Sequence, residues 1–228
     1  MNKLLSIIVP VYNEERLVNK SLPLIFSLNI NKEVIVVDDG SNDKTPESLN
    51  NLKNQYDFIL IRQDPNQGKG AAVRRGLEEM RGDYFIICDA DLEYDSQDVI
   101  KLFNEVIKEE NDKIVIYGSR FKNVKKISFH YLVNSFLTGM TNLLFGSRLT
   151  DVETCFKLVP KSALKKIHLS GKGFEIDPEI TARLLKSGYM IKEIPISYNR
   201  RTYKEGKKIT AKDGVLAVKT LLKEWLKK

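Results

Sequence analysis

The sequence predicts an α/β fold built on a mostly parallel, doubly wound sheet, with amphipathic helices toward the C-terminal end. Short runs rich in β-branched residues alternate with segments of helical apolar spacing over the first half of the chain. Polar clusters directly follow three of these runs, at the sheet edge where ligands of doubly wound folds bind. The 228 residues suffice for one such domain with a sizeable core.

The elements follow from these patterns in order. The runs LLSIIVPV and EVIVV are typical of buried parallel strands, and the helical spacing between them predicts a βαβ unit. A second unit and a further helix and strand come next. Asp177 is expected to cap a later helix, with Pro178 at its first position and Gly188 just past its end. Expected strands cover residues 4–11, 33–37, 58–61, 84–88 and 113–117, and expected helices cover 14–28, 45–54, 70–80, 97–109, 130–145, 177–186 and 211–225.

The net charge of +7 is concentrated near the end of the sequence, where residues 200–228 hold ten Lys or Arg and three Asp or Glu. We therefore expect residues 1–199 to form the α/β domain and residues 200–228 to form a basic loop and an amphipathic helix. Such a segment favours an anionic partner: lipid headgroups, phosphate or nucleic acid. Its helix either docks on the core or lies in a membrane interface.

Two further features concern the compartment. No stretch approaches about 20 uninterrupted apolar residues, so no transmembrane helix is predicted. Cys88 and Cys155 are too few for a disulfide framework and are interpreted as reduced thiols of a cytoplasmic protein.

The segment YFIICDADLEYD ends an apolar run with two carboxylates, Asp89 and Asp91. At this spacing on extended backbone they lie on the same side and repel each other unless a cation lies between them. Carboxylates without His or Cys suit Mg²⁺ or Mn²⁺, which usually retain substrate phosphates as ligands. The alternative is a strand that simply ends in an acidic turn. The segment NQGKG has the composition of a phosphate loop but lacks the Walker spacing.

Four motifs taken together resemble the family-2 glycosyltransferases of the GT-A fold, a Rossmann-like architecture: PVYNE, VVDDGSND, NQGKG and DAD. Four later segments, GSRF, TDVETCFK, GFEIDPEI and SYNRRTYKEGKK, are similar to the branch of dolichyl- and polyprenyl-phosphate mannose or glucose synthases. The resemblance covers nearly the whole chain and implies that residues 1–199 form the GT-A domain.

The resemblance also implies roles for individual residues. Mn²⁺ or Mg²⁺ would bind Asp89, Asp91 and Glu93, although Glu93 stands where the mannose synthases have Gln. The acceptor phosphate would meet Arg120, Arg201 and Lys208, which with Asp89 and Asp91 are the candidate catalytic residues. The donor nucleotide would be bound by Pro10, Tyr12, Glu14, Val37, Asp39, Lys69, Asp89, Ala90, Asp91 and Glu93.

The expected activity is the inverting, metal-dependent transfer of a hexose from GDP-mannose or UDP-glucose to a polyprenyl (dolichyl or undecaprenyl) phosphate. A cation stabilises the charge that develops on the leaving diphosphate, and Arg and Lys guide the anionic acceptor. We expect the protein at the cytoplasmic face of the membrane, held peripherally by the basic C-terminal segment or by a membrane partner protein.

Two alternative functions stay open. The acceptor could be a hydroxyl of a polysaccharide or protein, although no QxxRW motif of a processive polymer synthase is present. The basic segment could instead serve a nucleic-acid-binding module, but Tyr203 and Trp225 are its only aromatic residues. Single-strand binders interleave more aromatics with their basic residues, so no nucleic-acid partner is expected.

Overall fold

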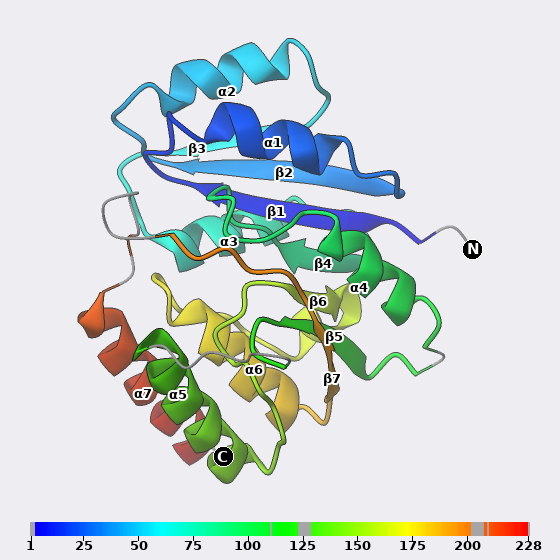
Figure 1. Cartoon of the computed structure of the whole chain (residues 1–228), viewed down its shortest axis with the longest axis vertical. Coiled ribbons are helices and arrows are strands. Elements are labelled where there is room, and N and C mark those ends of the chain that lie inside the picture. The colour runs from blue at the N-terminus through cyan, green and yellow to red at the C-terminus, as the bar shows by residue number, and fades with distance from the viewer. Residues whose placement is uncertain (1–2, 110, 123–128, 202–207, 209, 228) are drawn as a thin grey trace.

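The structure, a computed structural model, describes residues 3–109, 111–122, 129–201, 208 and 210–227. Within these ranges seven strands form one sheet in the order β3-β2-β1-β4-β6-β5-β7 (Figure 1). β6 runs antiparallel to both of its neighbours, and the remaining pairs are parallel. This confirms the predicted fold class. The strands are β1 (Leu5–Val11), β2 (Lys32–Asp39), β3 (Ile59–Gln63), β4 (Tyr84–Ile87), β5 (Ile114–Ser119), β6 (Lys157–Pro160) and β7 (Met190–Pro195).

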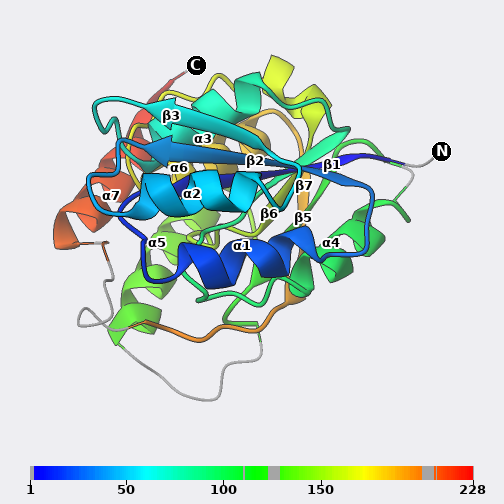
Figure 2. The same ribbon diagram turned by 90° about the horizontal axis from the view of Figure 1, so that it is seen from above.

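Helices lie on both faces of the sheet. Seen from above, α1 and α4 lie on one face and α3 and α6 on the other (Figure 2). α5 and α7 pack against each other and against α6. The α-helices of the described ranges are α1 (Val18–Phe26), α2 (Thr45–Lys53), α3 (Lys69–Glu78), α4 (Asp98–Val106), α5 (Phe129–Phe145), α6 (Ile176–Lys186) and α7 (Ala211–Leu226).

The core lies between the sheet and these helices. Ile8 of β1 and Val37 of β2 are fully buried. Gly76 lets α3 approach this part of the sheet, because a Cβ atom there would lie only 2.6 Å from Ile8 Cγ2. The close approach positions the N-terminal end of α3, and with it Lys69, at the carboxyl ends of the central strands.

Two strands, β6 and β7, were not predicted. β6 is only four residues long and includes Lys157, which is fully buried here although lysine seldom is.

The prediction that Asp177 caps α6 was wrong. The helix begins at Ile176, so Asp177 lies inside its first turn, and Pro178 is its third residue. Gly188 does follow the helix with a left-handed φ of +77°.

The C-terminal helix α7 docks on the core through one face. Ala217 and Leu221 are buried, and Arg183 of α6 forms an ion pair of 3.0 Å with Glu224. Other apolar side chains of the helix are exposed, among them Leu216 at 43% and Trp225 at 49%. In the ranges that the structure describes, every helix is too short or too polar to span a bilayer. The division of the chain at residue 199 stays a prediction.

Candidate active site

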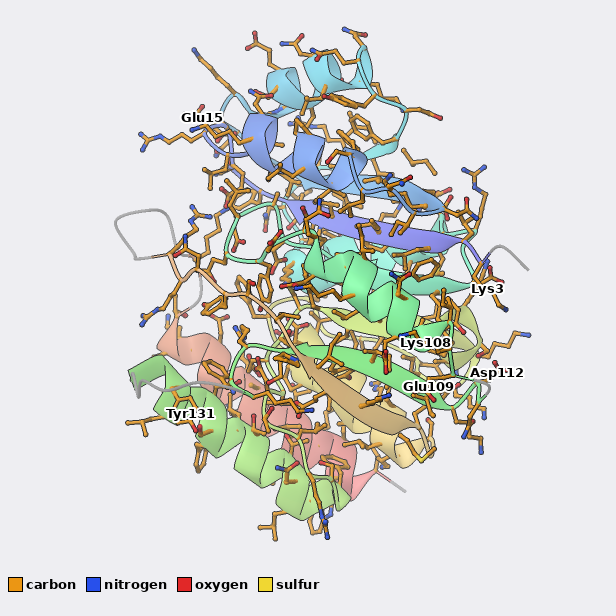
Figure 3. All side chains as sticks on the ribbon, turned by 45° about the vertical axis from the view of Figure 1, so that its right-hand side comes forward. Lys3, Glu15, Lys108, Glu109, Asp112 and Tyr131 are labelled. Atoms are coloured by element: carbon orange, nitrogen blue, oxygen red, sulfur yellow. The ribbon has the colours of Figure 1, made fainter. Side chains whose placement is uncertain are left out.

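A pocket of about 940 Å³ opens at the carboxyl ends of the central strands. Figure 3 locates this end of the molecule by Glu15 and Tyr131, whereas Lys3, Lys108, Glu109 and Asp112 lie at the opposite end. The pocket brings together segments far apart in sequence, from the end of β1 to α7. The predicted site residues in its lining are Pro10, Tyr12, Glu14, Asp39, Lys69, Asp89, Ala90, Asp91, Glu93, Arg120, Arg201 and Lys208.

Val37 is the predicted residue that the structure does not bring to this surface. Its side chain is fully buried and faces Gly76 of α3, and Val37 is not among the lining residues in the described part of the chain. Its role in donor binding stays a prediction.

The glycine-rich turn that precedes α3 is held by Asp39. The carboxylate accepts hydrogen bonds of 2.8 Å from the main-chain N–H groups of Gln67 and Gly68. Gly68 has a φ of +96°, and a Cβ at Gly40 would lie 2.6 Å from Asn66 N, so both positions require glycine. The acid of the second strand end therefore shapes the turn that leads into Lys69.

The two carboxylates after β4 have different surroundings. Asp89 Oδ2 lies 2.9 Å from Lys69 Nζ, whereas Asp91 Oδ1 accepts a hydrogen bond of 3.0 Å from the Glu93 N–H. Burial raises the pKa of Asp91 to about 7, and the nearby Asp89 carboxylate adds to the rise. A carboxyl with such a raised pKa is partly protonated near neutral pH, and a bound cation would stabilise its charged form instead.

The donor set fits a cation that is shared with a phosphate ligand. Among the described residues, no three His, Cys, Asp or Glu side chains form a ready-made metal group. Asp89 and Asp91 supply hard oxygen ligands, and Mg²⁺ typically takes one or two carboxylates and completes its shell with water and substrate phosphates. These two residues therefore could hold Mn²⁺ or Mg²⁺ together with a diphosphate.

Glu93 points to a different part of the chain. Its carboxylate accepts hydrogen bonds of 2.7 Å from Tyr198 Oη and 2.9 Å from the Arg201 N–H. Glu93 thus links the segment after β4 to the segment after β7 through hydrogen bonds. Its role as a metal ligand stays a prediction.

Arg201 and Lys208 both contact Glu14, a predicted donor residue. Arg201 Nη1 lies 3.4 Å from Glu14 Oε1, and Lys208 Nζ lies 2.6 Å from the same oxygen. Lys208 Nζ also donates to the main-chain carbonyl of Tyr12 and lies 5.6 Å from the centre of its ring. Two residues predicted for the acceptor phosphate thus contact Glu14 and Tyr12, which are predicted for the donor nucleotide.

Arg120 lies at the end of β5, paired with Asp151. Its guanidinium donates two hydrogen bonds of 2.8 Å to the two carboxylate oxygens, and its main-chain N–H donates a third of 3.0 Å. The cation also lies 5.2 Å from the Tyr198 ring. Burial lowers the pKa of Arg120, but Asp151 outweighs this effect and the pKa is raised, so the charge is permanent.

Several pocket residues were not predicted as site residues. Asp177, expected as a cap, is buried and lies 3.1 Å from Lys157 and 3.4 Å from Lys69. Glu153 and Asn134 also line the pocket. Glu153, Lys157 and Asp177 fall within motifs that carried the family resemblance, which was a usable signal. Asn134 lies in an apolar helix, where nothing in the sequence distinguished it.

Comparisons with known proteins agree with this geometry. The Glycosyl transferase family 2 profile matches residues 6–168. A dolichyl-phosphate beta-glucosyltransferase ALG5A of Trichomonas vaginalis is 33% identical, over 86% of this chain and 65% of its own length. A dolichol-phosphate mannosyltransferase of Pyrococcus furiosus is 30% identical, over 89% of this chain and 58% of its own. The chain thus spans about two thirds or less of the length of these relatives.

Solved structures share the fold. Glucosyl-3-phosphoglycerate synthase from Mycobacterium tuberculosis, crystallised with Mn²⁺, uridine diphosphate and phosphoglyceric acid, has a TM-score of 0.76. The alignment covers 98% of this chain and 79% of that chain at 16% sequence identity. The sheet order, the pocket at the strand ends and the family match lead to one conclusion: the chain belongs to glycosyl transferase family 2 and has the GT-A fold.

Proposed function

We propose that this chain transfers a hexose, with inversion, from a nucleotide-diphosphate sugar to a polyprenyl phosphate of the dolichyl or undecaprenyl type. The donor would be GDP-mannose or UDP-glucose, because the two relatives described above are named as a glucosyltransferase and a mannosyltransferase. Donor binding is assigned to the ends of β1, β2 and β4, and the acceptor phosphate to Arg120, with Arg201 and Lys208 acting where the two substrates meet.

One observation carries the proposal: a single pocket combines an acidic end, an arginine guanidinium and an apolar wall. Asp89 and Asp91 line one part, and Arg120 lines another. The wall is formed by α5 and α7, through Val133, Phe136, Leu137, Val215 and Val218. A polyprenyl phosphate has a matching structure, because its head is an anion and its chain is apolar.

The proposed reaction needs positioning and electrostatics more than proton transfer. An oxygen of the acceptor phosphate forms a bond to the anomeric carbon while the bond from that carbon to the β-phosphate oxygen breaks. The nucleoside diphosphate leaves. A divalent cation held by Asp89 and Asp91 would supply stabilisation of the leaving diphosphate. The acceptor is already an anion, so Arg120 is assigned to orient it and no general base is required.

We further propose that the protein works peripherally at the cytoplasmic face of the membrane, either by direct contact or with a membrane partner protein. The exposed faces of α5 and α7 support direct contact. Phe136 is 64% exposed and Trp225 is 49% exposed, and Lys219 and Lys223 of α7 are also exposed. Apolar and aromatic side chains flanked by lysines are typical of helices that lie in an anionic bilayer surface.

A transfer assay tests the proposal. Purified protein would be incubated with radiolabelled GDP-mannose, UDP-glucose or UDP-N-acetylglucosamine, a polyprenyl phosphate and Mn²⁺, and label in the lipid phase would be counted. We expect transfer from one of these donors, its loss when EDTA removes the metal, and a loss of at least about 100-fold in Asp91→Ala. Soluble hydroxyl acceptors run in parallel identify the alternative activity. No transfer to lipid with any donor would refute the proposal.

A further inference from the structure

Two polar side chains that line the pocket carry shielded atoms without a partner among the described residues. Oε1 of Glu153 is shielded from solvent and has no hydrogen-bond partner among the described residues, and the same is true of both polar atoms of Asn134. Asn134 is only 6% exposed, and both residues line the pocket. Leaving such groups unpaired costs on the order of 1–3 kcal/mol each, so a ligand that satisfies them gains affinity.

The two residues come from neighbouring elements. The Val152 N–H donates a hydrogen bond of 3.1 Å to Thr138 Oγ1 of α5. Asn134 precedes Thr138 by four residues, so it lies one turn away on the same face of the helix. Glu153 directly follows Val152. The contact between Val152 and Thr138 therefore fixes the Asn134 turn of α5 beside the segment that carries Glu153.

Glu153 interacts with charged groups of both the donor and the acceptor parts of the pocket. Its carboxyl interacts electrostatically with Asp177 and Lys157, and also with Arg120 and Asp151. The first pair is joined to the donor end, because Lys69 bridges Asp177 and Asp89. The second pair contains the guanidinium assigned to the acceptor phosphate. The group that passes from donor to acceptor must occupy the space between these two parts.

We propose that Glu153 and Asn134 bind hydroxyl groups of the transferred sugar and so determine which hexose the protein accepts. This inference rests on the proposed function. A sugar hydroxyl both donates and accepts hydrogen bonds, which matches the accepting oxygen of Glu153 and the mixed amide of Asn134. A site that hydrogen-bonds a substrate hydroxyl discriminates strongly against an analogue that lacks it, because its buried groups then stay unpaired.

The test compares binding of a nucleoside diphosphate with binding of the same nucleotide carrying its sugar. Dissociation constants would be measured by calorimetry with Mn²⁺ for GDP and GDP-mannose and for UDP and UDP-glucose. We expect Glu153→Ala and Asn134→Ala each to weaken binding of the preferred nucleotide sugar by about 10-fold while the nucleoside diphosphate binds as in wild type. Deoxy analogues of the sugar should lose less affinity in the variants than in wild type, at the hydroxyl that each residue binds.

Two further variants make the result specific. Glu175 also has a shielded oxygen without a partner but does not line the pocket, so Glu175→Ala is the matched control and should leave the ratio of the two constants unchanged. Glu153→Gln keeps a hydrogen-bonding group and should retain transfer within about 10-fold. A loss of transfer in Glu153→Gln with normal sugar-nucleotide binding would assign proton transfer to Glu153 and overturn the inference.

The other outcomes are also decisive. Equal weakening of nucleotide and nucleotide sugar, or unchanged binding of both in the alanine variants, overturns the sugar site while leaving the transferase proposal intact. Wild-type protein that binds neither GDP-mannose nor UDP-glucose overturns both proposals.

Discussion

The ammonium group of Lys69 lies between two carboxylates from different parts of the chain, 2.9 Å from Asp89 Oδ2 and 3.4 Å from Asp177 Oδ2. Burial lowers the pKa of Lys69, but Asp177 and Asp89 outweigh this effect and raise it well above its ordinary value. Asp177 in turn lies 3.1 Å from the fully buried Lys157. This chain of charges links the carboxyl end of β4 to α6 and β6.

The first prediction concerns Asp177. Asp177→Asn removes the charge that neutralises Lys157, and Lys157 has no exposed surface. Breaking one side of a buried ion pair costs about 3–5 kcal/mol because the remaining charge is left uncompensated. We expect the free energy of unfolding, measured by urea titration, to fall by that amount. Glu175→Gln, a charge removal at the neighbouring N-cap of α6, should cost less than about 1 kcal/mol.

A double variant tests the stated cause. In Asp177→Asn combined with Lys157→Met, the uncompensated cation is gone, and part of the lost stability should return. Additive losses in the double variant would show that the ion pair is not the source of the effect.

The second prediction concerns the geometry of Arg120. Its guanidinium meets both oxygens of Asp151 at 2.8 Å, an arrangement that an ammonium group cannot reproduce. We expect Arg120→Lys to reduce transfer to polyprenyl phosphate by more than about 10-fold, with the effect mainly in the dependence on acceptor concentration. Calorimetric binding of the donor nucleotide should stay within a factor of about 2, because Arg120 is assigned to the acceptor.

Asp151→Asn serves as the companion variant. It keeps the side chain's shape but weakens the fixation of Arg120, so acceptor use should again suffer more than donor binding. Equal losses of donor and acceptor binding in both variants would argue against the assignment of Arg120.

The third prediction is a pH effect that originates in Glu153. Burial, with a contribution from Asp177, raises the pKa of this carboxyl from 4.5 to about 7 in the folded protein. Below pH 4.5 both the folded and the unfolded chain are protonated at this site. Between pH 4.5 and 7 only the unfolded chain releases the proton, so the folded state loses stability as pH rises, and the loss is complete above pH 7.

Glu153→Gln removes this titration. The variant should match wild type near pH 4.5 and exceed its free energy of unfolding at pH 8 by on the order of 2 kcal/mol. Urea titrations at pH 4.5, 6 and 8 provide the measurement. Glu47→Gln, at an exposed position of α2, should change stability little at any of these values. A stability difference independent of pH would show that Glu153 keeps an ordinary pKa.

The fourth prediction concerns the exposed faces of α5 and α7. Replacing Phe136 and Trp225 by serine removes two large exposed apolar side chains, and we expect binding to vesicles of phosphatidylglycerol to weaken by at least about 10-fold in a sedimentation assay. Leu24→Ser is the control, because Leu24 is 49% exposed on α1.

Salt separates the two contributions to this binding. Raising the salt concentration should weaken the contribution of Lys219 and Lys223 but not that of the apolar side chains. Equal vesicle binding by wild type and the double variant would favour attachment through a membrane partner protein.

The acidic end of the pocket could be predicted because it depends on local patterns. Asp39, Asp89 and Asp91 each lie within three residues of the end of an apolar run, and parallel strands place their carboxyl ends at one edge of a sheet. Lys69 follows a glycine turn that opens a helix. These rules need only a few consecutive residues, and Asp39 and the NQGKG turn do lie together in the structure through hydrogen bonds to Gln67 and Gly68.

The sequence by itself therefore determined the α/β class, the positions of β1, β2 and β4 and the acidic residues near the ends of β2 and β4, because strand propensity and turn chemistry act over short stretches. Only the tertiary structure decided that β6 runs antiparallel between β4 and β5, that Lys157 pairs with Asp177, and that Glu153 and Asn134 line one pocket. Those contacts join segments far apart in the chain, and their energy comes from burial and charge compensation that exist only after the elements have packed.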